Sequence, residues 1–177
     1  MNRVQSILKL AKDVGFEEAG VLDPKTVELK TEVRDICADG TCRSYGHNWQ
    51  CPPAVPELPE CRRILNGFNE GILVETVGEL EDPLDYESMM EAGKLHKKRL
   101  LELSKKIRDI SPEALCLGAG GCDVCEKCRY PGPCIFPELS LASMEAFGMV
   151  VSEICKANQV PYYHGPDTIT YVGCCLF

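Results

Sequence analysis

Cysteine is the residue type best able to do chemistry in this 177-residue chain, with 12 cysteines against 3 histidines. Four of them form a C-x2-C-x2-C run followed by one more cysteine: Cys122, Cys125, Cys128 and Cys134. Three thiolates at this tight spacing fit three corners of a four-iron cluster, and a fourth thiolate nearby completes the set. Zinc sites more often use two separated C-x2-C pairs. The run therefore favours an iron–sulfur cluster ([4Fe-4S]), with zinc as the alternative.

Cys134 departs from the bacterial ferredoxin pattern, in which the fourth cysteine follows after three residues and precedes a proline. Here the gap is longer, and Pro133 comes before Cys134 rather than after it. Which metal group takes Cys134 therefore stays open at this point. The glycines at 118, 120 and 121 lack a phosphate-loop pattern, and we expect them to allow close approach of the backbone to the metal centre.

A second and looser set of cysteines lies earlier in the chain, at Cys37, Cys42, Cys51 and Cys61. Because residues 35–59 contain four prolines, we expect an irregular segment that a bound metal would order. Cys61 is the weak member, since a buried core thiol on a helix face is an equal alternative. Without Cys61, the shell would be completed by His47, by another cysteine or by an open iron position.

The remaining cysteines are expected in the core rather than at a metal. Cys116 lies between two leucines of a predicted strand, and Cys155 lies on an apolar helix face. Cys174 and Cys175 are adjacent in a predicted strand, so their side chains should point to opposite faces of the sheet.

Three other residues have side chains that suggest a local role. His96 falls on the apolar stripe of a predicted helix and should be a satisfied buried histidine. His164 lies at a predicted turn, where nothing fixes its role. Trp49 lies within the first cysteine loop and is expected to pack over it and shield a site from water.

Helical and strand patterns alternate along the chain and predict an α/β fold. We expect a single mixed sheet flanked by helices, interrupted by two cysteine-rich metal-binding loops, in one domain over residues 1–177. The lysine-rich side of the longest helix is expected to be a solvated face. Helices are predicted over residues 4–15, 60–65, 84–110 and 141–156, and strands over residues 16–22, 71–77, 114–117, 160–163 and 168–177.

Charge and hydropathy exclude several classes of function. The formal net charge of -8 argues against binding to nucleic acid or to an anionic membrane surface. No apolar run is long enough for a membrane span, and the N-terminus lacks the apolar core of a signal peptide. A cytoplasmic location follows as an expectation, and there thiols stay reduced and clustered cysteines more often bind metal than form disulfides. No hydrolase motif or dinucleotide-binding glycine pattern is present.

Three strings of the sequence, CRSYGHNWQCPP, GAGGCDVCEKCRYPGPCIFP and SMEAFGMVVSEIC, resemble a family of small predicted metal-binding proteins, domain of unknown function 2284. The resemblance runs from about Val33 to the C-terminus. It implies that both cysteine sets recur in the family, and that Cys174 resembles a further recurrent position. The opening, ILKLAKDVGFEEAGVLDP, is similar to the start of iron–sulfur and corrinoid-dependent reductases such as epoxyqueuosine reductase, which suggests only an α/β fold.

These observations lead to three competing functions. The first is an electron-transfer or redox accessory protein with one or two [4Fe-4S] clusters and a redox protein partner. The second is a zinc-stabilised protein-interaction module, in which the cysteines hold the loops together. The third is a cluster- or corrinoid-dependent reductase.

Overall fold

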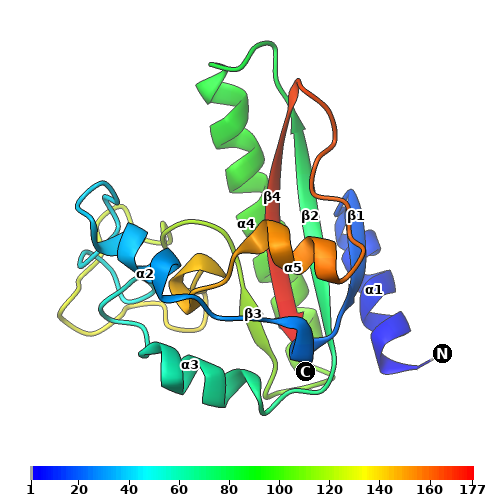
Figure 1. The fold of residues 1–177 in the computed structure, drawn as a ribbon, viewed down its shortest axis with the longest axis horizontal. Helices are drawn as coiled ribbons and strands as arrows, with labels where there is room; N and C mark the ends of the chain where they lie inside the picture. The colour runs from blue at the N-terminus through cyan, green and yellow to red at the C-terminus, as the bar shows by residue number, and fades with distance from the viewer. Residues whose placement is uncertain (1) are drawn as a thin grey trace.

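A four-stranded antiparallel sheet in the order β1-β2-β4-β3 forms the centre of this computed structural model, which describes residues 2–177 (Figure 1). The α/β class and the sheet flanked by helices are confirmed, while every strand pair is antiparallel, so strand direction in the sheet is not mixed. The strands are β1 (Glu18–Leu22), β2 (Gly71–Glu79), β3 (Leu115–Leu117) and β4 (Thr168–Leu176).

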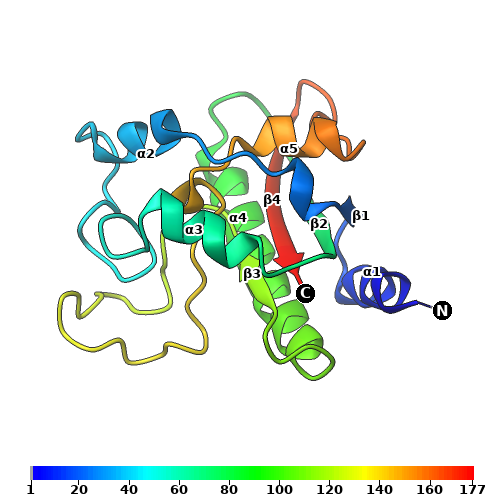
Figure 2. The same cartoon turned by 60° about the horizontal axis from the view of Figure 1, so that its bottom comes forward.

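Helices cover both faces of the sheet, with α1 and α4 on one face and α5 on the other (Figures 1 and 2). Local sequence signals explain α1, because Asn2 caps its start and Gly15, at φ 105°, ends it. The helices are α1 (Arg3–Val14), α2 (Thr31–Ala38), α3 (Leu58–Leu65), α4 (Tyr86–Arg108) and α5 (Val151–Ala157), with short 3-10 turns η1 (Pro24–Thr26) and η2 (Glu145–Phe147). No helix within residues 2–177 is long and apolar enough to cross a membrane.

The core cysteines lie where the sequence predicts them. Cys174 is buried on the α5 side of the sheet and Cys175 on the α1 and α4 side, as strand alternation requires. Cys116 and Cys155 are also buried. His96 is fully buried and its Nδ1 lies 3.2 Å from Thr76 Oγ1, but its Nε2 has no hydrogen-bond partner among the described residues, so it is only half satisfied.

The prediction of one long helix over residues 141–156 is wrong. The chain there forms η2, turns at Gly148 with φ 79°, and starts α5 only at Val151. A Cβ at Gly148 would lie 2.7 Å from Leu58 Cδ2 of α3, and the positive φ itself favours glycine at this turn. The apolar periodicity arose because short segments of different structure all face the same core.

Two further expectations need correction. The segment over residues 35–59 is not irregular throughout, since α2 continues to Ala38 and places Cys37 in its last turn. Residues 160–163 form no strand, and Val160 instead packs its side chain against Gly20 of β1. Pro161 has no backbone N–H, which weakens any strand pairing at this point.

Candidate metal centre

The four cysteines of the later set line one cavity. Cys122, Cys125, Cys128 and Cys134 share it with Trp49, Gln50, Val124, Phe136 and Ser140. All four are free thiols of intermediate exposure, and the loop that carries them contains no helix or strand. The structure thus brings together, around one cavity, the four residues that the spacing predicts as ligands.

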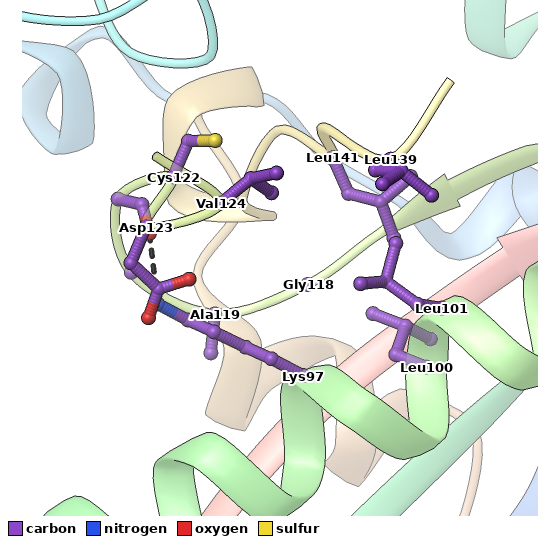
Figure 3. A pocket seen from close by; sticks show the side chains of 12 residues that line it. Lys97, Leu100, Leu101, Gly118, Ala119, Cys122, Asp123, Val124, Leu139 and Leu141 are labelled. Carbon is purple, nitrogen blue, oxygen red and sulfur yellow. Dashed lines mark hydrogen bonds and ion pairs between the residues drawn. The ribbon is translucent and has the colours of Figure 1, made fainter. Parts of the chain in front are cut away.

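Helix α4 and the first cysteine loop hold the start of this loop in place. Lys97 reaches from α4 and donates to the backbone carbonyl of Gly121 at 2.9 Å and to the Asp123 carboxylate at 2.7 Å (Figure 3). Close approach explains two of the glycines, since a Cβ at Gly118 would lie 3.0 Å from Leu100 of α4 and one at Gly121 would clash with Ser44. The glycines therefore allow the loop to pack against other parts of the chain.

Three cysteines of the earlier set form a second group of neighbours. Burial is the largest cause that raises the pKa of the Cys37 thiol, and the nearby thiols of Cys42 and Cys51 raise it further. Burial likewise raises the pKa of Cys51, although hydrogen bonds from Asn48 and from the Cys122 backbone lower it. The Cys122 backbone therefore lies beside Cys51, and the two cysteine sets are neighbours.

Cys61 lies apart from this group, on α3. It is fully buried, and its Sγ donates to the carbonyl of Pro56 at 3.3 Å. Burial raises the pKa of its thiol, and the charge that lowers it belongs to Arg34. These are the surroundings of a core thiol, and a ligand role for Cys61 stays a prediction.

The two cysteine loops pack against each other at one end of the molecule, where the chain near residues 40–55 and 121–140 lies together in both views (Figures 1 and 2). Trp49 of the first loop donates from Nε1 to the carbonyl of Gly132 at 2.8 Å, and its ring meets Tyr130 edge-on at 5.0 Å between centroids. Gln50 also donates to Ser140 Oγ at 2.8 Å. Trp49 thus joins the two loops, rather than covering the first loop alone.

The donor set fits a thiophilic metal group. Within residues 2–177, no three Cys, His, Asp or Glu side chains converge as ligands of a single ion. Thiolates around one zinc would lie about 3.8 Å apart, given Zn–S bonds of about 2.3 Å. Thiolates bind zinc and also the iron atoms of a cluster, so the donor set fits a thiophilic metal group of either kind.

Burial raises the pKa of Cys122, partly offset by a hydrogen bond from the Val124 amide, while the neighbouring Cys125 and Cys128 raise it further. Metal ligation requires thiolates, so a metal must displace protons from these groups. Charge repulsion among the thiolates would fall once a cation lies between them.

A buried acid–base pair that sequence analysis missed lies on the α5 side of the sheet. Glu75 of β2 is fully buried, and its carboxylate lies 2.8 Å from His164 Nε2, which gives His164 a partner. Burial raises the pKa of Glu75, while His164 opposes the shift. The Cys155 Sγ lies 3.9 Å from Oε1 of the same carboxylate, and burial and the charge of Glu75 raise the pKa of this thiol to about 12. The available signal was a glutamate, Glu75, within the apolar part of a predicted strand.

Comparison with known proteins supports a metal-binding role. A family model described as predicted metal-binding protein (DUF2284) matches residues 20–177, which include both cysteine sets and extend N-terminal to the expected Val33 boundary. No curated protein and no solved structure matches the chain. The matched region covers most of the chain, so this protein belongs to the DUF2284 family of predicted metal-binding proteins.

Proposed function

We propose that this protein is an iron–sulfur redox protein that carries a [4Fe-4S] cluster in the loop from Gly121 to Pro137. The observation that supports this most directly is that the four cysteines of the C-x2-C-x2-C-x5-C run line one cavity. A four-iron cluster held by four thiolates supplies one-electron transfer at such a site. The earlier cysteine set is proposed to hold a second metal group beside it.

The surrounding residues are suited to shield and position such a group. Trp49 and Phe136 present aromatic surface to the cavity, which would limit access of water to the cluster. Lys97 fixes the start of the loop through Gly121 and Asp123. Because the Cys122 backbone lies close enough to lower the pKa of Cys51, the two proposed metal groups would be neighbours.

Anaerobic purification with iron, acid-labile sulfide and zinc quantified together tests the proposal. We expect a brown protein with matching iron and sulfide, and a lower content of both in Cys125→Ser. Cys116→Ser is the matched control, because Cys116 is buried in the core beside β4 and should leave the metal content unchanged. A colourless protein with stoichiometric zinc would contradict the proposal and favour a zinc-stabilised interaction module.

A redox partner protein is proposed to dock beside the cluster loop, on the outer side of α4. A groove of about 660 Å³ there is lined by four lysines, with leucine and valine side chains between them: Lys94, Lys97, Lys98, Leu101, Glu102, Lys105, Asp123, Val124 and Leu139. The chain as a whole carries a net charge of -8, so this groove is a local basic surface on an acidic protein. An acidic redox protein would be steered to it, since complementary charge raises association rates.

Charge reversal in the groove tests this partner surface. We expect Lys94→Glu with Lys98→Glu and Lys105→Glu to slow electron transfer with an acidic flavodoxin, used as the probe, by about 10-fold or more at low salt. The effect should fade as ionic strength rises. The same reversal at Lys9, Lys12 and Lys25, which are exposed and lie outside the groove, serves as the control for net charge. Equal slowing in both triple variants would contradict docking at the groove.

A further inference from the structure

A second cavity lies beside the one that the later cysteine set lines. It has a volume of about 210 Å³, and three residues, Trp49, Gln50 and Ser140, line both cavities. Ser140 also lies near a proposed metal ligand, because its Oγ is 4.0 Å from the Sγ of Cys134. No thiol of the two proposed metal sites lines this second cavity, so metal binding does not account for it.

Much of the wall of this second cavity is apolar and buried. The buried apolar side chains that line it are those of Val55, Leu117, Ala142 and Phe147. At about 30 Å³ per molecule, the cavity would take about seven waters. It is smaller than the pockets of about 300–1,000 Å³ that hold drug-sized ligands. Its size and its lining therefore fit a small organic molecule with an apolar body.

Among the described residues that line this cavity, only Arg108, at the C-terminal end of α4, carries a charge. Arg108 is half-buried, and of its five N–H donors one, at Nη1, reaches the carbonyl of Glu138 at 3.5 Å. Arg3, Arg63 and Arg99 each pair with a glutamate. No carboxylate within residues 2–177 forms an ion pair with Arg108. The cavity thus offers a cation that no acidic side chain neutralises.

The polar side chains between the two cavities are engaged within the protein. Gln50 Nε2 donates to Ser140 Oγ at 2.8 Å, and Ser140 Oγ donates in turn to the carbonyl of Pro137 at 3.2 Å. These bonds leave Arg108 as the main donor available to a ligand in the second cavity. A planar guanidinium binds a carboxylate through two parallel hydrogen bonds, which fixes the position of the acid as well as its charge.

We propose that this cavity binds a small organic carboxylate, with Arg108 as its anchor and the buried apolar wall around its body. The inference rests on the proposed function in one respect, since a redox-active group would lie on the other side of Trp49 and Ser140 from the ligand. The alternative is that Arg108 only stabilises the carbonyl end of α4, as cations at helix C-termini do. Lys106 separates the two roles, because it lies in the same last turn but does not line the cavity.

Isothermal titration calorimetry tests the site in the full-length protein, prepared without oxygen and with its metal content measured. The probes are benzoate and benzamide, which have nearly the same shape but differ in charge. The variants are Arg108→Gln and, as the matched control, Lys106→Gln, which removes a cation from the same turn of α4. Far-UV circular dichroism shows whether each variant folds.

We expect the unmodified chain to bind benzoate at least about 10-fold more tightly than benzamide, because only the carboxylate forms charge-assisted hydrogen bonds with Arg108. Arg108→Gln should weaken benzoate binding at least about 10-fold and leave benzamide binding unchanged, while Lys106→Gln should change neither. Three results would overturn the assignment: no binding of benzoate, equal binding of the two probes to the unmodified chain, or equal weakening in both variants. Benzoate binding to a preparation that contains zinc would support the site while contradicting the iron–sulfur proposal.

Discussion

Trp49 is predicted to control how firmly the two cysteine loops hold metal. Trp49→Phe keeps an aromatic ring against Tyr130 but removes the Nε1–H that donates to Gly132 O at 2.8 Å. A neutral hydrogen bond contributes about 1 kcal/mol net. Since about 1.4 kcal/mol corresponds to a factor of ten, loss of this bond should shift the equilibrium between docked and separated loops by about 5-fold.

Trp49→Ala removes the aromatic contact as well. An edge-on aromatic pair adds about 0.5–1.5 kcal/mol beyond the area that it buries. Because Trp49 is only partly buried, we assign about 1 kcal/mol to the loss of its apolar contact, well below the cost of a fully buried ring. The total of about 3 kcal/mol corresponds to loops that separate about 100-fold more often.

The assay is the rate at which metal passes to an excess of chelator under anaerobic conditions. If metal leaves from the separated state, release should be about 5-fold faster in Trp49→Phe and about 100-fold faster in Trp49→Ala. Tyr163→Ala, at a side chain that is 74% exposed, controls for the loss of a surface aromatic. Release from Trp49→Ala no faster than from Tyr163→Ala would refute the idea that this contact retains the metal.

Three further predictions follow from contacts near the sheet and the loops. His164→Ala removes the partner of the buried Glu75 carboxylate and should lower the free energy of unfolding by about 2 kcal/mol at pH 7, measured by urea unfolding. Burial raises the folded-state pKa of Glu75, so this carboxyl stabilises the fold at low pH and loses that contribution as pH rises through the folded pKa. The free-energy cost of His164→Ala should therefore be smaller at pH 5 than at pH 7. An equal cost at both pH values would contradict the pairing of His164 with Glu75. Gly121→Ala places a methyl group against Ser44 and should shorten the half-time of metal retention, whereas unchanged retention would show that the loops can shift freely. The affinity of the metal-free protein for metal should fall by about tenfold per pH unit, for each proton displaced, as pH falls from 8 to 6, because burial raises the pKa of thiols such as Cys51. Competition with a chelator measures this affinity. An affinity that does not depend on pH would argue against thiolate ligands.

The parts of the fold that sequence analysis predicted are those fixed by neighbouring residues. Helix α1 follows from its apolar spacing and from Gly15, and β2 follows from a run of β-branched and apolar residues. The segment over residues 141–156 has an equally apolar pattern, but contacts from distant residues break it. Gly148 turns against Leu58, and Met149 bridges to Leu29, so periodicity alone misassigned this segment.

The candidate site shows the same division between local and distant information. Spacing alone grouped the four cysteines of the later loop, because ligands in one short loop depend on nearby sequence. Spacing gave no sign that Trp49 would bond to Gly132, 83 residues away, or that His164 would meet Glu75, 89 residues away. Such contacts depend on how the sheet brings the loops together.

The distribution of cysteines between core and loops explains how one chain could hold so many thiols and still direct metal to defined places. Cys155 and Cys174 are buried against the sheet, and burial raises the pKa of each thiol well above its usual value. A thiol that stays protonated is a poor metal ligand. In the loops, Cys122 receives a hydrogen bond from the Val124 amide, and Cys51 receives one from the Cys122 amide. Burial still raises the net pKa of Cys51 and of Cys122, so what favours metal in the loops is that several thiols lie together there and one cation can neutralise their combined charge.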